Sequence, residues 1–159
     1  MKKALAILLM AGVAMAGLAG TADAGPLLEL RDATDPTEIR SSFRTERSFS
    51  GFSEVAVSRD GGTVAAVSLE AIATFDGTLA PRWEAETGGH VPVSVALSHA
   101  GRYVFTVGAE GALLATRGED ARSAGRVAVT DPVTVRADPS GTAILVGSRD
   151  GALRAFACR

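Results

Sequence analysis

The sequence predicts an all-β fold built from repeated units of antiparallel strands. Three similar stretches, SRDGGTVA, SHAGRYVF and DPSGTAIL, place Gly61, Gly101 and Gly141 forty residues apart. Runs in which apolar and polar residues alternate flank each stretch, as in half-buried strands. The chain carries no apolar stripe with the 3.6-residue period of a helix. Short strands that return about every 40 residues favour a β-propeller-like array of about three four-stranded blades. An ordinary β-sandwich with evenly spaced turns is the alternative.

Residues 1–24 are predicted to be a cleavable signal peptide. Lys2 and Lys3 precede an apolar run, and Ala22-Asp23-Ala24 is a small-x-small cleavage site. We expect cleavage after Ala24 and a periplasmic or secreted protein with no stable membrane insertion. The competing interpretation is a retained membrane anchor, since the apolar run is about long enough to span a bilayer.

Residues 25–52 are expected to form an N-terminal segment with part of a blade. Leu27–Arg31 has strand character, and a turn-like stretch, Asp32–Pro36, follows it. Ser42–Phe49 lies forty residues before Arg82–Gly89 and is expected to be a last strand of a blade. The chain therefore enters the array partway through a blade.

Residues 53–159 are expected to form three propeller-type repeats, at about 53–92, 93–132 and 133–159. In the first repeat, Ile72–Asp76 is one residue out of step, which indicates a small deletion. The third repeat lacks its final strand. The other strands that we expect in the second and third repeats are Ser94–Ser98, Tyr103–Gly108, Ala112–Thr116, Thr134–Asp138, Ala143–Ser148 and Ala152–Phe156.

Such an array is too short to close into a ring, because propellers typically have four to eight blades. An exposed apolar edge invites pairing with another chain. We expect two chains to close a six-bladed ring as a homodimer, with Ser42–Phe49 of one chain completing the third blade of the other. Two alternatives stay open: a fragment of a longer propeller, and an open or sandwich-like stack of sheets.

Several motifs resemble those of a known family. V-x-V-S-x-D-G in Val55–Gly61 and G-S-x-D-G-x-L-R-x-F in Gly147–Phe156 are similar to WD-repeat blades. Gly89-His90 stands where that family keeps a Gly-His pair, and Tyr103–Thr106 is similar to YVTN-type blades of secreted bacterial propellers. The resemblance covers the chain from about Ser42 to the C-terminus.

The resemblance is incomplete inside the blades. In WD repeats a His, a Ser, an Asp and a Trp form a hydrogen-bonded set, and no repeat here holds all four. The His position reads Ser50, His90 and Thr130, and the Trp position reads Thr116 in the second repeat and Phe156 in the third.

The resemblance implies a rigid scaffold whose loops bind a protein partner, with no catalysis of its own. The loops that we expect to carry recognition are Asp76–Arg82, Gly88–Pro92, Arg117–Gly125 and Asp131-Pro132. The alternatives are an enzyme or electron-transfer subunit, like propeller lactonases and quinoproteins, and a truncated fragment of a larger propeller.

The sequence predicts no catalytic residue, metal site or cofactor. It has no G-x-S-x-G elbow and no phosphate-binding G-x-x-x-x-G-K-[ST] loop. Its single cysteine, Cys158, excludes an internal disulfide and C-x-x-C-H haem attachment, and is either incidental or an intermolecular bridge. His90 and His99 fall at opposite ends of one strand, so one chain cannot bring both to one zinc ion. Carboxylates at turns usually cap backbone N–H groups.

Six residues are the candidates for binding: Arg82, Trp83, His90, Arg117, Glu119 and Asp120. Trp and Arg are enriched in binding hot spots, but Trp83 could instead pack between neighbouring blades. His90 could be a structural hydrogen-bonding residue, and the charged loop could be a solvated surface. The near-neutral net charge of −2 argues against a nucleic-acid partner.

Overall fold

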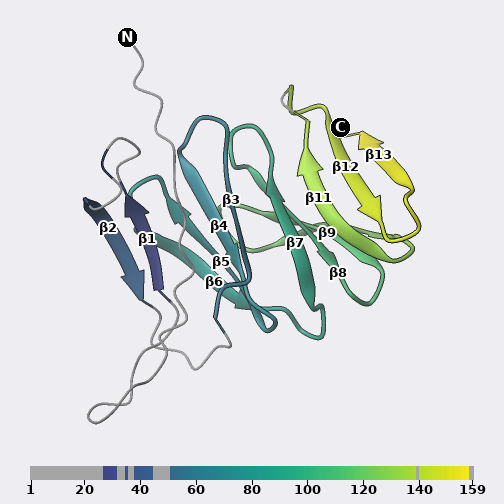
Figure 1. Cartoon of the computed structure of the whole chain (residues 1–159), viewed down its shortest axis with the longest axis horizontal. Coiled ribbons are helices and arrows are strands. Elements are labelled where there is room, and N and C mark those ends of the chain that lie inside the picture. The colour runs from purple at the N-terminus through teal and green to yellow at the C-terminus, as the bar shows by residue number, and fades with distance from the viewer. Residues whose placement is uncertain (1–26, 32–34, 36–37, 45–50, 139, 158–159) are drawn as a thin grey trace.

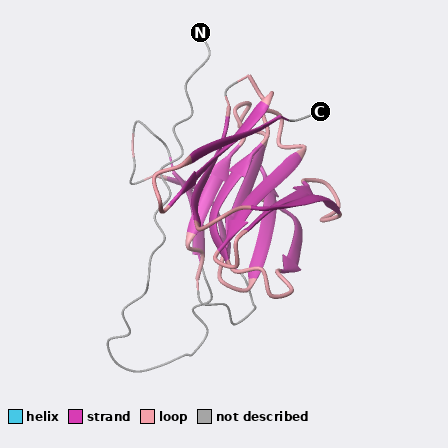
Figure 2. Ribbon diagram, turned by 90° about the vertical axis from the view of Figure 1, so that its right-hand side faces the viewer, coloured by secondary structure: helices cyan, strands magenta, loops and turns pink. Residues whose placement is uncertain are grey.

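The computed structural model describes residues 27–31, 35, 38–44, 51–138 and 140–157. These residues form antiparallel strands and no helix (Figures 1 and 2). The expected signal peptide, Cys158 and the positions of Ser48, Phe49 and Ser50 lie outside the described residues.

The strands form one two-stranded sheet and three larger sheets, which we call the first, second and third blades. The two-stranded sheet contains β1 (Leu27–Arg31) and β2 (Ile39–Arg44). The first blade contains β3 (Glu54–Val57), β4 (Thr63–Val67), β5 (Ala71–Asp76) and β6 (Pro81–Glu86). The second contains β7 (Pro92–Leu97), β8 (Tyr103–Gly108), β9 (Ala112–Arg117) and β10 (Ser123–Ala128). The third contains β11 (Pro132–Ala137), β12 (Ala143–Ser148) and β13 (Leu153–Ala157).

The repeated glycines occupy equivalent turns, which confirms the repeat. Gly61, Gly101 and Gly141 have φ angles of 71°, 68° and 75°, in the left-handed region that glycine adopts most easily. Each donates its N–H to a carbonyl three residues earlier, at 2.8–2.9 Å. The glycines therefore set where the first strand of each blade turns into the second.

The deletion expected in the first repeat lies in the turn between β4 and β5. Val67 pairs with Ile72, whereas Val107, forty residues further on, pairs with Leu113. The turn in the first blade is therefore one residue shorter. β5 begins at Ala71, whereas the position forty residues before the start of β9 is Ile72.

The strand expected at Ser42–Phe49 lies only partly within the described residues. Its first three residues, Ser42–Arg44, form the end of β2, which begins at Ile39 and pairs with β1, and residues 45–49 lie outside the described residues. Phe43 and Leu28 are paired across this sheet, and the Phe43 ring packs edge-on against Phe75 at 4.6 Å between centroids. The apolar contact with the first blade sets the position of β2.

The core consists of three apolar layers between successive sheets. The first lies between β1–β2 and the first blade and includes Leu28, Leu30, Val64 and Phe75. The second joins the first two blades, and the third joins the second and third blades. Full burial of one such side chain contributes roughly 1.5–3 kcal/mol, so these layers hold the sheets face to face.

The blades stand in chain order around one side of a common axis, and the described sheets do not close into a ring (Figure 1). The first strands β3, β7 and β11 lie side by side, with β7 in the middle. The fold is thus an all-β, propeller-like array with an open end.

Candidate functional site

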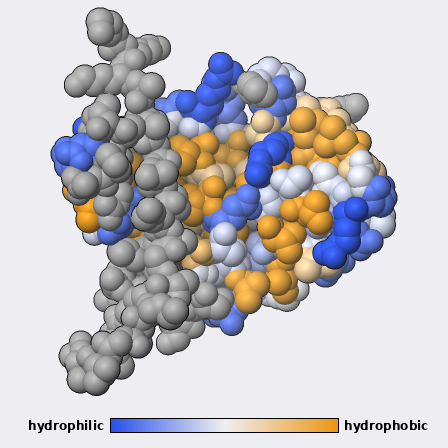
Figure 3. All heavy atoms as spheres, viewed as in Figure 1, coloured by the Kyte–Doolittle hydropathy of each residue, from blue (hydrophilic) through white to orange (hydrophobic). Residues whose placement is uncertain are grey.

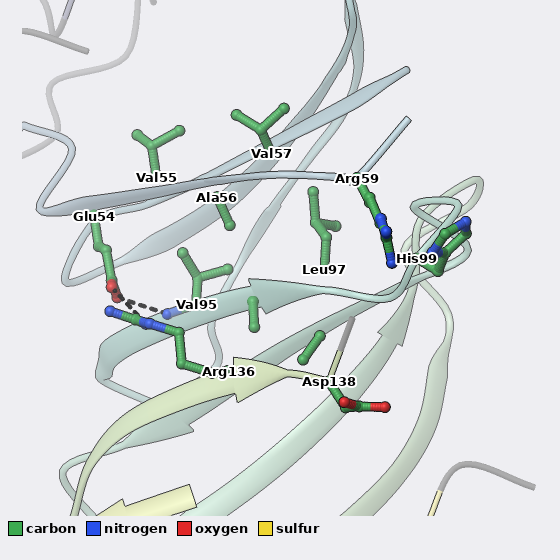
Figure 4. A pocket seen from close by; sticks show the side chains of 12 residues that line it. Glu54, Val55, Ala56, Val57, Arg59, Val95, Leu97, His99, Arg136 and Asp138 are labelled. Atoms are coloured by element: carbon green, nitrogen blue, oxygen red, sulfur yellow. Dashed lines mark hydrogen bonds and ion pairs between the residues drawn. The ribbon is translucent and has the colours of Figure 1, made fainter. Parts of the chain in front are cut away.

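The first strands of the three blades line a groove along the axis, which we call the axial groove (Figure 4). Its volume is about 610 Å³. Its apolar wall comes mainly from residues of β3 and β7, and its charged residues stand toward the two ends (Figure 4). The lining residues that carry the argument are Glu54, Val57, Arg59, His99, Arg136 and Asp138.

Glu54 and Arg136 join the first and third blades at one end of the axial groove. A guanidinium nitrogen of Arg136 lies 3.3 Å from Glu54 Oε1 and 2.7 Å from the carbonyl oxygen of Val135. The other carboxylate oxygen of Glu54 accepts the N–H of Val95 at 2.7 Å. One carboxylate therefore bridges all three blades.

The same contact recurs one blade further on. Ser94, forty residues after Glu54, accepts the N–H of Val135 at 3.2 Å through its hydroxyl oxygen. β7 and β11 are edge strands, so amides that point away from their own sheet need a partner from elsewhere. A polar side chain at this repeat position supplies that partner and fixes the spacing of the blades.

Turn residues form the other end of the axial groove. Asp138 accepts hydrogen bonds from the hydroxyl and backbone N–H of Ser140, and the Ser140 hydroxyl is the main cause of its lowered pKa. Arg59 and His99 also line the groove at this end (Figure 4). Their placement beside an apolar wall suits a ligand with both polar and apolar parts.

A hydrogen-bonded turn supports this end in the first blade. The Ser58 hydroxyl donates to Asp60 at 2.6 Å and accepts the N–H of Thr63 at 2.9 Å. The Ser58 hydroxyl, followed by the N–H of Gly62, holds the pKa of Asp60 below its ordinary value. Asp60 therefore caps the turn, as expected from its position.

Trp83 lies on β6 and packs between the first and second blades. Its ring packs against the apolar layer that includes Val67 and Val95. Its indole Nε1–H donates to the carbonyl oxygen of Gly118 at 2.9 Å. Trp83 therefore packs between neighbouring blades, and a binding role for it stays a prediction.

Arg82 lies beside Trp83 and is bound within its own blade. Its guanidinium donates to the hydroxyl of Thr63 and to the carbonyl oxygen of Gly62, both at 3.1 Å. These bonds fasten β6 to the start of β4, at the same end of the blades as the turn glycines.

Arg117, Glu119 and Asp120 lie in or beside the loop between β9 and β10. Asp120 contacts Arg122 at 3.4 Å and Arg117 at 3.9 Å, and all these side chains are exposed. Because the Trp83 indole binds Gly118 of this loop, the structure brings five of the six candidates to one end of the blades.

His90 lies at the opposite end and forms a hydrogen-bonded set inside the second blade. It is buried, and its Nε2 lies 2.9 Å from the hydroxyl of Thr106. Its Nδ1 bonds the carboxylate of Glu110, which also accepts the N–H of Val91 at 3.3 Å. Burial raises the pKa of Glu110, but the His90 bond and the backbone bonds outweigh it, so the pKa is lowered.

The axial groove was not found from the sequence. It joins residues that lie about 41 or 82 positions apart, on three strands whose adjacency depends on the packing of the blades. One signal was present: positions 54, 94 and 134, forty residues apart, carry the polar residues Glu, Ser and Thr in the first strand of each repeat.

Within the described residues, no group of three or more His, Cys, Asp or Glu side chains is arranged to hold a metal ion. A membrane-spanning helix, long and apolar enough to cross a bilayer, is likewise not found in that part of the chain.

No family model matches the chain, and no curated protein matches it. Among solved structures, the chain is similar to hydrazine synthase from Kuenenia stuttgartiensis, with a TM-score of 0.60 and 16% sequence identity. The match covers 72% of this chain and 35% of that one. At this identity the likeness concerns the fold alone, and it agrees with the propeller-like arrangement of the sheets.

Proposed function

We propose that this chain is an exported propeller-type scaffold that binds a partner in the axial groove. The groove itself carries the proposal: all three blades line it, with an apolar wall mainly from β3 and β7 and charged groups at both ends. Sites of several hundred Å³ with few polar groups around an apolar surface are typical of binding pockets. Val57, on the groove wall, is 36% exposed and available for contact.

A relation to WD-repeat or YVTN-type blades is part of this proposal. The hydrogen-bonded set of His90, Thr106 and Glu110 supports it, because these residues stand at the turn and strand positions of the WD-repeat pattern. Here a Thr and a Glu replace the usual Ser and Asp.

Site-specific photo-crosslinking tests the binding role. A benzoylphenylalanine at Val57 should crosslink a partner in the exported fraction, whereas the same group at Leu69, an exposed turn residue outside the groove, should not. The purified partner should then bind the wild type about tenfold more tightly than R59E, because that change reverses a charge at the groove's end. Equal crosslinking at both positions, or equal affinity for both proteins, would refute the groove as the site.

An enzyme or electron-transfer subunit is the second candidate, since the similar solved structure is by name an enzyme. Purified protein would be incubated with lactones, and separately with a quinone and an artificial electron acceptor. The scaffold proposal expects no turnover above buffer, and sustained turnover that is lost on heat denaturation would favour the enzyme.

Export has its own test. N-terminal sequencing of the protein from a periplasmic or secreted fraction should begin at Gly25, directly after the expected cleavage site. An intact Met1 on a membrane-bound protein would instead support the retained anchor.

A further inference from the structure

A second pocket lies between the second and third blades, away from the axis. It has a volume of about 330 Å³, and we call it the aromatic slot. Its walls are mainly apolar and include three aromatic rings; the principal residues are Tyr103, Phe105, Leu113, Val127, Ile144 and Phe156. Tyr103 and Val127 remain 37% and 44% exposed, so a ligand would find apolar surface there that the fold leaves uncovered.

The equivalent space between the first and second blades is filled by Trp83. Trp83 pairs with Thr74 of β5, and the corresponding pair in the second blade is Gly125 with Ala115. Both pairs lie beside a register irregularity at the start of the outer strand. Glycine therefore stands where the first blade has an indole, and a Cβ added at Gly125 would meet no described atom within 4 Å.

The edge of β13 borders the aromatic slot. In the first two blades a fourth strand, β6 or β10, pairs with the third strand, whereas β13 has no such partner among the described residues. Phe156 and Ala157 of β13 line the slot. An extended segment that pairs with this edge would point every second side chain toward the slot.

Arg126 lies at the rim of the aromatic slot. Its side chain is exposed and forms no ion pair with any residue that the structure describes. A guanidinium there favours an acidic residue beside the inserted ring.

We propose that the aromatic slot and the edge of β13 bind an extended segment of a protein partner, with a tryptophan inserted between the blades and an acidic residue beside Arg126. Three observations favour this occupant. Trp83 fills the equivalent space between the first and second blades, Arg126 places a positive charge at the rim, and the slot is continuous with the packed interface of the second and third blades. The inference rests on the proposed scaffold role but uses a surface separate from the axial groove.

The test measures fluorescence anisotropy of a fluorescein-labelled peptide, Thr-Val-Asp-Val-Trp-Thr, in which Asp and Trp share one face. Wild-type protein should bind it about tenfold more tightly than the same peptide with Ala in place of Trp. G125W fills the slot and should weaken binding about tenfold. L69W, which adds a tryptophan at an exposed turn outside the slot, is the matched control and should bind like the wild type.

Circular dichroism shows whether G125W folds. If it does not, a pair of charge reversals, one in the protein and one in the peptide, tests the same proposal. R126E should weaken binding about fivefold, and a peptide with Lys in place of Asp should restore it. Equal binding of the Trp and Ala peptides to the wild type, unchanged binding by folded G125W, or no rescue by the Lys peptide would overturn the proposal. None of these results would alter crosslinking at Val57, so the two proposals fail independently.

Discussion

Glu110 accepts bonds from the buried His90 ring and from the N–H of Val91, and Glu54 likewise accepts the N–H of Val95. At the scale of single residues, these carboxylates satisfy groups that the β-ladder leaves without a partner. An unpaired buried donor costs about 1–3 kcal/mol, which is more than most surface ion pairs contribute. The polar residues that matter most for stability are therefore those that meet backbone or buried groups.

Removing Glu110 tests this reasoning. E110A leaves Nδ1 of the buried His90 ring without its partner and should lower the free energy of unfolding by about 1–2 kcal/mol in urea denaturation. E119A removes an exposed carboxylate at the opposite end of the second blade and should change the free energy of unfolding by less than about 0.5 kcal/mol. Equal effects of the two substitutions would show that the His90 bond contributes nothing.

The lowered pKa of Glu110 also predicts a pH dependence. Because its folded pKa lies below its unfolded pKa, the stability that it adds is present above the unfolded value and is lost as pH falls through the folded value. Urea denaturation at a series of acidic pH values should show that the free energy of unfolding falls more steeply with decreasing pH for the wild type than for E110Q. Parallel curves would contradict the assignment.

At the scale of elements, the turns and strands could be predicted closely from the repeat. The strands expected at Tyr103–Gly108 and Ala143–Ser148 are β8 and β12 with the same bounds. Alternation and turn glycines are local signals, so they locate strands well. The packing of Phe43 in β2 against Phe75 was not predicted, because it is a contact that the repeat does not signal.

The repeated glycines differ in their surroundings, although their backbones are alike. A Cβ at Gly101 would collide with the buried Thr63 side chain, which also binds Arg82, whereas at Gly61 no described atom lies within 4 Å. G61A should lower the free energy of unfolding by about 1 kcal/mol, because alanine disfavours the positive φ angle. G101A should lower it by about 2–4 kcal/mol, because the added Cβ also collides with Thr63. Thermal unfolding of both variants measures the difference, and equal losses would show that Thr63 does not constrain the turn.

At the scale of the whole molecule, the third blade presents an uncovered face. In the second blade, the side chains that meet the next blade include Phe105, Leu113 and Ala115. The equivalent residues of the third blade, forty positions further on, are Leu145, Leu153 and Ala155. Of these, Leu153 is 70% exposed. In Figure 3 apolar residues cover part of the upper right, where the third blade lies, as well as the middle of this face. This periodicity favours a further partner on that side.

Closure by a second copy remains our expectation for that partner. Analytical ultracentrifugation at micromolar concentration should give a mass near twice that of the monomer, because an open apolar end favours association. The tryptophan peptide should shift the protein toward monomer if the second copy uses the edge of β13. A monomer at all concentrations would contradict two-chain closure.

Equivalent blades pack around a common axis through side chains that bind the next blade's first strand. Amide hydrogen exchange followed by NMR tests it directly, at Val95 and Val135. We expect both amides to be protected, and E54A to expose Val95 while leaving Val135 protected. Exchange of both amides at the rate of an unstructured chain, or no effect of E54A on Val95, would contradict the account.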